Sequence, residues 1–199
     1  MTVESPELQV KLHLVDGRDE TFNVRDAAEA AHILDLINPG KFFEPKQLVI
    51  GCEHHITAFQ TTLITHIEFV SPRVPAWNFH HNVRSIREVA PDVYFAKLAA
   101  SGKFETPVGE VYQAFAEIEL TSGINIYLTL DINTDAAISP LTSLDQHIFL
   151  QQLFHSYGMH VHHRNVGAII INPGHIARLS MHPGPSRTPA GAWTGERAN

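Results

Sequence analysis

Cysteine and basic clusters are scarce in this sequence. Cys52 is the only cysteine among 199 residues, which excludes an internal disulfide bond and a cluster of thiolate metal ligands. The formal net charge is −7, and no run of lysine or arginine opposes it locally. Because such a chain repels a nucleic-acid backbone on average, nucleic acid is not an expected partner.

Long apolar runs are also lacking. No apolar stretch approaches the roughly 20 residues that span a bilayer, and the opening MTVESPELQV has neither the basic region nor the apolar run of a signal peptide. We therefore expect a cytoplasmic protein without a membrane span. The sequence contains no nucleophile motif and no lysine-bearing phosphate loop, so it assigns no catalytic residue.

The first part of the chain predicts a strand pair followed by a helix. Residues 8–15 alternate between apolar and polar side chains, and an Asp-Gly turn separates them from a return strand over 21–24. Asp26 and Glu29 have the spacing of a capping box, so a helix should begin there. Its apolar stripe continues to an Asn-Pro-Gly stop.

The stretch from Leu48 to Val70 predicts a β-hairpin, and a diverged copy of it returns near the C-terminus. ITAFQTTLITHIEFVS (56–71) aligns without a gap with AIIINPGHIARLSMHP (168–183), which places Phe59 over Ile171. A single matching hairpin would be weak evidence, because apolar alternation is common to all hairpins.

The second half of the chain repeats the order of the first. Strands are predicted over 110–120 and 124–132 with a glycine turn between them. A capping box at Ser143 predicts a helix that runs to Tyr157, and the second hairpin covers 159–181. The recurrence of strand, turn, strand, capped helix and hairpin indicates an internal duplication.

The fold class that follows is α+β, with two tandem related ββαββ units packed on a shared core. The predicted domains are a first unit at 1–71, a connector that can hold a short helix at 72–107, a second unit at 108–182, and a Pro/Gly-rich tail at 183–199.

Histidine is the compositional outlier, with fourteen residues. On a strand, His160 and His162 would share one face, and His54 and His66 lie in the corresponding hairpin of the first unit. If the units pack about a pseudo-twofold axis, these imidazoles converge and can bind a divalent metal such as zinc. The alternative is a set of surface or interface histidines that make ordinary hydrogen bonds.

Two functional hypotheses remain. The leading one is a non-enzymatic binding or assembly protein that homo-oligomerises or acts as a subunit of a larger complex, because duplicated sheets with open edges favour protein-protein pairing. The alternative is a histidine-based metal-binding protein or metal-dependent enzyme with its site between the two units. Native mass measurement tests the first hypothesis, and elemental analysis tests the second.

Overall fold

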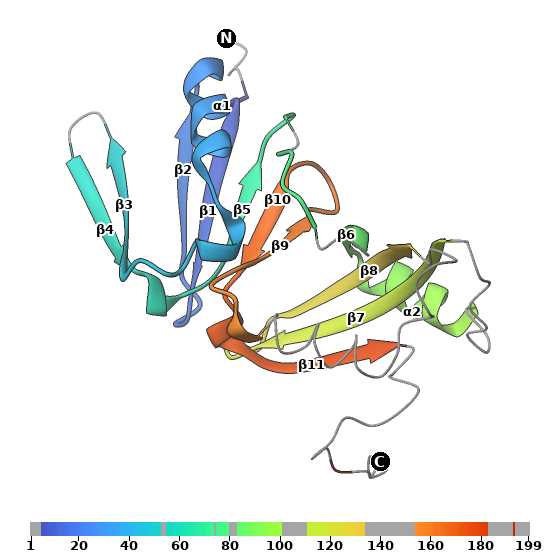
Figure 1. Ribbon diagram of the computed structural model, residues 1–199. Helices are drawn as coiled ribbons and strands as arrows, with labels where there is room; N and C mark the ends of the chain where they lie inside the picture. Colours follow the sequence, from blue (N-terminus) through green and yellow to red (C-terminus); the bar gives the residue numbers. More distant parts are fainter. Residues whose placement is uncertain are drawn as a thin grey trace.

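A computed structural model of the chain describes residues 5–52, 55–73, 75–79, 83–100, 111–133, 154–182 and 193. This described part is an α+β fold dominated by strands: nine form one mixed sheet, two form a second sheet, and two α-helices accompany them (Figure 1). Within these ranges, no helix is both long enough and apolar enough to cross a bilayer.

The first strand pair and its helix form as predicted. Strands β1 (Leu8–Leu14) and β2 (Asp19–Val24) are antiparallel, and the turn between them places Gly17 at φ +83°, a region that glycine enters without steric cost. Helix α1 (Ala27–Leu36) is capped by Asp26, whose carboxylate accepts a hydrogen bond of 2.8 Å from the backbone N–H of Glu29.

The prediction of one hairpin over Leu48–Val70 is wrong, because this stretch contains three strands. Strands β3 (Gln47–Cys52) and β4 (His55–Gln60) pair with each other as a separate two-stranded sheet. After a single 3₁₀ turn, β5 (Ile64–Val70) does not fold back on β4 but lies between two other strands of the large sheet.

The side chain of Asn172 holds the chain at the point where β5 diverges from β4. Its amide nitrogen donates to the carbonyl oxygens of Thr61 (3.2 Å) and Ile64 (2.9 Å), at the two ends of the 3₁₀ turn. Asn172 comes from the far end of the sequence, so the local alternation of residues 56–70 contains no signal for this break.

The stretch interpreted as a connector contributes to the large sheet. Strand β6 (Val83–Val89), which sequence periodicity did not predict, pairs antiparallel with β8 (Asn125–Asn133) and meets β9 (Met159–His162) in parallel, with Arg87 opposite His162. The short helix expected after it is present as α2 (Pro91–Ala100).

The second half supplies the remaining strands. They are β7 (Val111–Leu120), β8 (Asn125–Asn133), β9 (Met159–His162), β10 (Ala168–Ile171) and β11 (Ile176–His182). Here too the predicted hairpin is three strands, since β9 pairs with β10 while β11 pairs with β7. The predicted helix up to Tyr157 lies outside the described residues except for its last four positions, as does the tail apart from Trp193.

The large sheet has the strand order β11-β7-β8-β6-β9-β10-β5-β1-β2 and bends strongly along this order (Figure 1). Its apolar side chains form two buried clusters rather than the single shared core that the sequence predicted, one around β6, β7 and β8 and the other around β1, β5 and α1. Strand β10 joins them, because Ile169 and Ile171 point into the first cluster and Ile170 points into the second.

Candidate functional site

The structure does not bring the predicted metal ligands together. His160 and His162 do share one face of β9, as expected, but His66 lies on the opposite face of the sheet: β10 sets His160 opposite Ile170 and His66 opposite Ile171. His54 lies outside the described residues.

His160 sits in an aromatic environment rather than a ligand sphere. Its ring stacks on Phe79 with centroids 4.4 Å apart and meets Trp77 edge-on at 5.7 Å. Its Nε2 atom is buried and has no hydrogen-bond partner among the described residues. Burial, together with the neighbouring His162, lowers the pKa of His160 to about 4, so this ring is neutral near pH 7.

A different group of histidine and carboxylate side chains does converge, on the face of the sheet opposite His160. Strand β1 places His13 directly opposite His66 of β5, and Glu68 lies two residues further along β5. The ligand atoms of these three side chains all lie within 4.8 Å of one another. The two imidazole rings are stacked, with centroids 4.0 Å apart and planes 3° from parallel.

Hydrogen bonds fix which nitrogen of His66 carries its proton. The Thr65 hydroxyl donates to the backbone oxygen of His13 at 3.0 Å, so its oxygen is left to accept the other bond, of 3.0 Å, from Nδ1–H of His66. The neutral His66 ring therefore keeps its lone pair on Nε2.

His13 is held between two carboxylates. Its Nδ1 lies 2.8 Å from Oδ1 of Asp19, while its Nε2 lies 3.3 Å from Oε1 of Glu68 in a contact that is not aligned as a hydrogen bond. Burial opposes a charge on His13, but the contacts with Glu68 and Asp19 outweigh burial and raise its pKa.

His13 in turn shifts the pKa values of its two neighbours. Its contact with Glu68 lowers the pKa of that carboxyl group to about 2, although burial acts in the opposite direction. Burial, with the positive charge of His13 beside it, lowers the pKa of His66 to about 3. At neutral pH the cluster thus holds a neutral imidazole at His66 and a carboxylate at Glu68, and the raised pKa of His13 favours the protonated form of that ring.

More charged groups surround this cluster. Lys11 Nζ lies 3.6 Å from Glu68, and Nε2 of His163 lies 4.0 Å from Glu68 and 3.6 Å from Glu88. Nδ1 of His163 accepts a hydrogen bond of 3.2 Å from the backbone N–H of Asn165, so the ring proton of a neutral His163 sits on Nε2. His163 is therefore a partner of the carboxylates and has no lone pair to offer on that side.

The sequence could have given only half of this group. His66 and Glu68 are two residues apart on one strand, so alternation alone places them on one face. His13 joins them through the pairing of β1 with β5 across more than fifty residues, and the register of that pairing contains a bulge at His13/Leu14 that no local pattern reveals.

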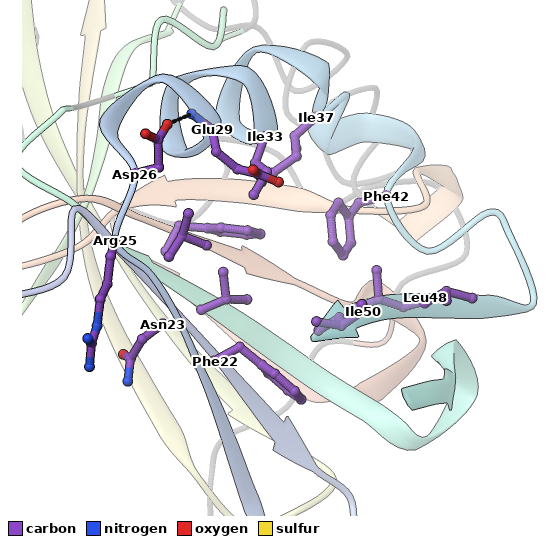
Figure 2. A pocket seen from close by; sticks show the side chains of 15 residues that line it. Phe22, Asn23, Arg25, Asp26, Glu29, Ile33, Ile37, Phe42, Leu48 and Ile50 are labelled. Atoms are coloured by element: carbon purple, nitrogen blue, oxygen red, sulfur yellow. Dashed lines mark hydrogen bonds between the residues drawn. The ribbon is translucent and has the colours of Figure 1, made fainter. Parts of the chain in front are cut away.

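An open apolar groove lies between α1, β2 and β3, on the face of β1 opposite His13. It has a volume of about 680 Å³. Figure 2 shows Ile33 of α1, Ile37 just after it and Phe42 facing Phe22 and Ile50 across the groove. Four polar residues lie along its rim: Asn23, Arg25, Asp26 and Glu29.

The hairpin β3–β4 contains only exposed and half-buried positions among its described residues. Neither strand pairs with a strand of the large sheet, so each has an outer edge that is open among the described residues. Val49 of β3 is 58% exposed and Ile56 of β4 is 75% exposed. Strand β11 is the terminal strand of the large sheet, and its outer edge pairs with no strand that the structure describes.

Comparison of the chain with protein-family models, with curated proteins and with solved structures gives no match.

Proposed function

We propose that the protein is a non-enzymatic assembly protein that homo-oligomerises by pairing β4 of one copy with β11 of a second copy. The observation that carries this proposal is the β3–β4 hairpin, which leaves two strand edges and the apolar side chains of Val49 and Ile56 exposed. Open strand edges are templates for pairing with another chain, and monomeric proteins normally cover or charge them.

The choice of β11 as the partner rests on a second inference, that the chain is a tandem repeat. In this interpretation β1, β2, β3, β4 and β5 correspond to β7, β8, β9, β10 and β11. The pairings support it: β1 pairs with β2 and β5 as β7 pairs with β8 and β11. The register recurs as well, with Leu12 opposite Ile67 in one case and Ile118 opposite Leu179 in the other.

Irregular features of the two segments also correspond. The pairing of β1 with β5 skips Thr65, and the pairing of β7 with β11 skips Ala177, which is the residue aligned with Thr65. Gly17 and Gly123 have the same φ of 83°. Three backbone hydrogen bonds at the first turn also have counterparts at the second. At the first turn, the N–H groups of Leu14, Gly17 and Val15 donate to the carbonyl oxygens of Arg18, Leu14 and Leu63. At the second turn, the N–H groups of Leu120, Gly123 and Thr121 donate to the carbonyl oxygens of Ile124, Leu120 and His175.

The proposed repeat predicts which strand pairs with the open edge of β4. Strand β10 pairs antiparallel with β5, with Ile170 opposite Ile67. The offset of 112 residues that relates Phe59 to Ile171 relates β4 to β10 and β5 to β11. The equivalent contact therefore joins β4 and β11. Applied to Ile169 and Glu68, which are also opposite each other, it predicts that Thr57 faces Ser180.

These two strands belong to different copies in this proposal. Figure 1 shows β4 and β11 well apart in one molecule, and each has an edge that pairs with no described strand. A twofold axis between two copies would form the contact twice, once in each direction, and such an isologous interface closes at a dimer.

A cysteine cross-link tests both the contact and its register. We expect the Thr57→Cys, Ser180→Cys variant in a Cys52→Ser background to oxidise to a covalent dimer, because directly opposed strand residues have the Cα separation that a disulfide needs. The matched control is Thr57→Cys with Leu179→Cys, in which a shift of one residue turns the second thiol to the other face. Non-reducing electrophoresis of the oxidised proteins measures the yield.

The oligomeric state of the native chain provides the second measurement. Light scattering should give a mass near twice 22.2 kDa. Ile56→Lys should shift the mass to that of one chain, whereas Leu36→Lys, at an exposed apolar residue of α1 that is 70% accessible, should not. A native chain that stays monomeric at about 100 μM, or equal cross-linking of the two cysteine pairs, contradicts the proposal.

A further inference from the structure

We infer that His13, His66 and Glu68 form a binding site for a divalent transition-metal ion such as Zn²⁺, a site distinct from the interface proposed above. All three ligands come from one copy of the chain, on the adjacent strands β1 and β5. Two imidazoles and one carboxylate are a donor set that suits zinc and related borderline metals and that leaves room for a water molecule as a further ligand.

The first support is the proton arrangement of the two histidines. In metal sites, a ligating histidine usually donates its other ring N–H to a carboxylate or another oxygen, which fixes the tautomer and the ring orientation. Nδ1–H of His66 donates to the Thr65 hydroxyl, and Nδ1 of His13 lies 2.8 Å from the Asp19 carboxylate. The Nε2 atom of each ring, on the side of Glu68, is therefore the atom that would bind the metal.

The second support is the orphaned nitrogen of His13. Its Nε2 atom is buried and has no aligned hydrogen-bond partner among the described residues, although a carboxylate oxygen of Glu68 lies 3.3 Å away. Buried polar atoms are rarely left unsatisfied, and an ion between this nitrogen and the carboxylate would satisfy both. Binding requires that Nε2 of His13 carry no proton, because a ligating imidazole offers its lone pair to the metal.

Binding requires a small local rearrangement. Ligand atoms around a tetrahedral zinc ion are about 3 to 3.6 Å apart, whereas the present atoms are spread over as much as 4.8 Å. The two rings are nearly parallel, so their lone pairs run side by side and must tilt toward each other. Lys11 must also release Glu68, from which it lies 3.6 Å away. The His13 and Glu68 side chains are 14% and 19% exposed, which leaves solvent access for these movements.

Zinc titration of the full-length, tag-free, metal-stripped chain tests the site. By isothermal titration calorimetry, we expect one Zn²⁺ per chain, and we expect His13→Gln and Glu68→Gln each to weaken binding by about 100-fold or more. Asp19→Asn, at a side chain that is 61% exposed, should keep the fold and weaken binding by about 10- to 100-fold, the usual effect of removing the partner of a ligating histidine. His162→Gln, on the opposite face, is the matched control and should change the affinity less than about threefold.

Two further readouts separate a lost ligand from a lost fold. Circular dichroism melts of the metal-free variants report folding, and Co²⁺ substituted for Zn²⁺ gives visible bands that depend on the ligands. These bands should be present in the native chain and in His162→Gln and absent in His13→Gln. The inference is overturned if the native chain binds no Zn²⁺ below about 10 μM, or if His13→Gln and Glu68→Gln stay folded and bind it within threefold of the native chain.

Discussion

Hairpin β3–β4 precedes β5 in the chain and hairpin β9–β10 precedes β11, yet the surroundings of the two hairpins differ completely. All four residues of β10, Ala168–Ile171, are buried, and the hairpin lies inside the nine-stranded sheet between β5 and β6. In β4 every residue is exposed or half-buried, and the hairpin pairs with no other strand that the structure describes.

This difference shows how the composition of a strand follows from the number of faces that it buries. A strand covered on both faces has a continuous apolar run, as in Ala-Ile-Ile-Ile, whereas a strand covered on one face alternates. Hairpin β9–β10 joins the two buried clusters and therefore contributes to the stability of the single chain. Hairpin β3–β4 packs Leu48, Ile50 and Phe59 against the edge of the second cluster, but none of its described residues is fully buried.

The largest expected effect of this contrast is on core stability. Ile170→Ala should lower the free energy of unfolding by about 2 to 5 kcal/mol, because Ile170 is fully buried and its truncation leaves a cavity. Ile56→Ala on β4 should change it by less than about 0.5 kcal/mol. Urea denaturation at protein concentrations that keep the chain monomeric measures both. Equal losses would show that the two hairpins do not differ in this way.

A smaller effect is expected from one glycine in each hairpin. Gly167, in the β9–β10 turn, has φ of +102°, and a Cβ atom at this position would overlap the backbone oxygen of Phe69. Gly167→Ala should therefore destabilise the chain by about 2 to 3 kcal/mol.

The glycine of the other hairpin is Gly51, which lies within β3 and where an added Cβ atom meets nothing within 4 Å. Gly51→Ala should be neutral or stabilise the chain by up to about 1 kcal/mol, because alanine restricts the unfolded state. Thermal melts of the two variants measure the difference, and a loss of stability in Gly51→Ala would indicate that this hairpin is packed more tightly than its exposure suggests.

The sequence predicted those parts of the fold that local patterns determine. Alternation, the turn at Gly17 and the cap at Asp26 located β1, β2 and α1 correctly. Local patterns cannot determine which strands pair, so the stretch from Leu48 to Val70 was assigned one hairpin instead of three strands in two sheets. The strand β6 was missed because half of its residues are polar and its neighbours in the sheet are distant in sequence.

The candidate site was predictable to the same limited extent. The alternating pattern of one strand predicted His160 and His162 as metal ligands. The aromatic rings that surround His160, Phe79 and Trp77, come from the predicted connector. A cluster such as His13 with His66 depends on the register of two strands far apart in the chain, and composition alone cannot supply that register.

The smallest expected effect concerns pH and the buried histidine of β9. The pKa of His160 is about 4 in the folded chain, against about 6.5 for an unfolded histidine. The unfolded state therefore binds more protons between these values, and the contribution of neutral His160 to stability is lost as pH falls from about 6.5 toward 4. Since the ring is only partly shielded from solvent, we expect a loss on the order of 2 kcal/mol.

His160→Phe tests this contribution because a phenyl ring keeps the stacking on Phe79 but does not titrate. Denaturant melts at pH 7 and at pH 4 should show that the native chain loses on the order of 2 kcal/mol more than His160→Phe does. His55→Gln, on the exposed strand β4, controls for the removal of one histidine and should follow the native chain. If His160→Phe instead loses as much stability as the native chain between pH 7 and pH 4, the ring of His160 accepts its proton in the folded state. Hairpin β9–β10 would then be more open to solvent than its burial indicates.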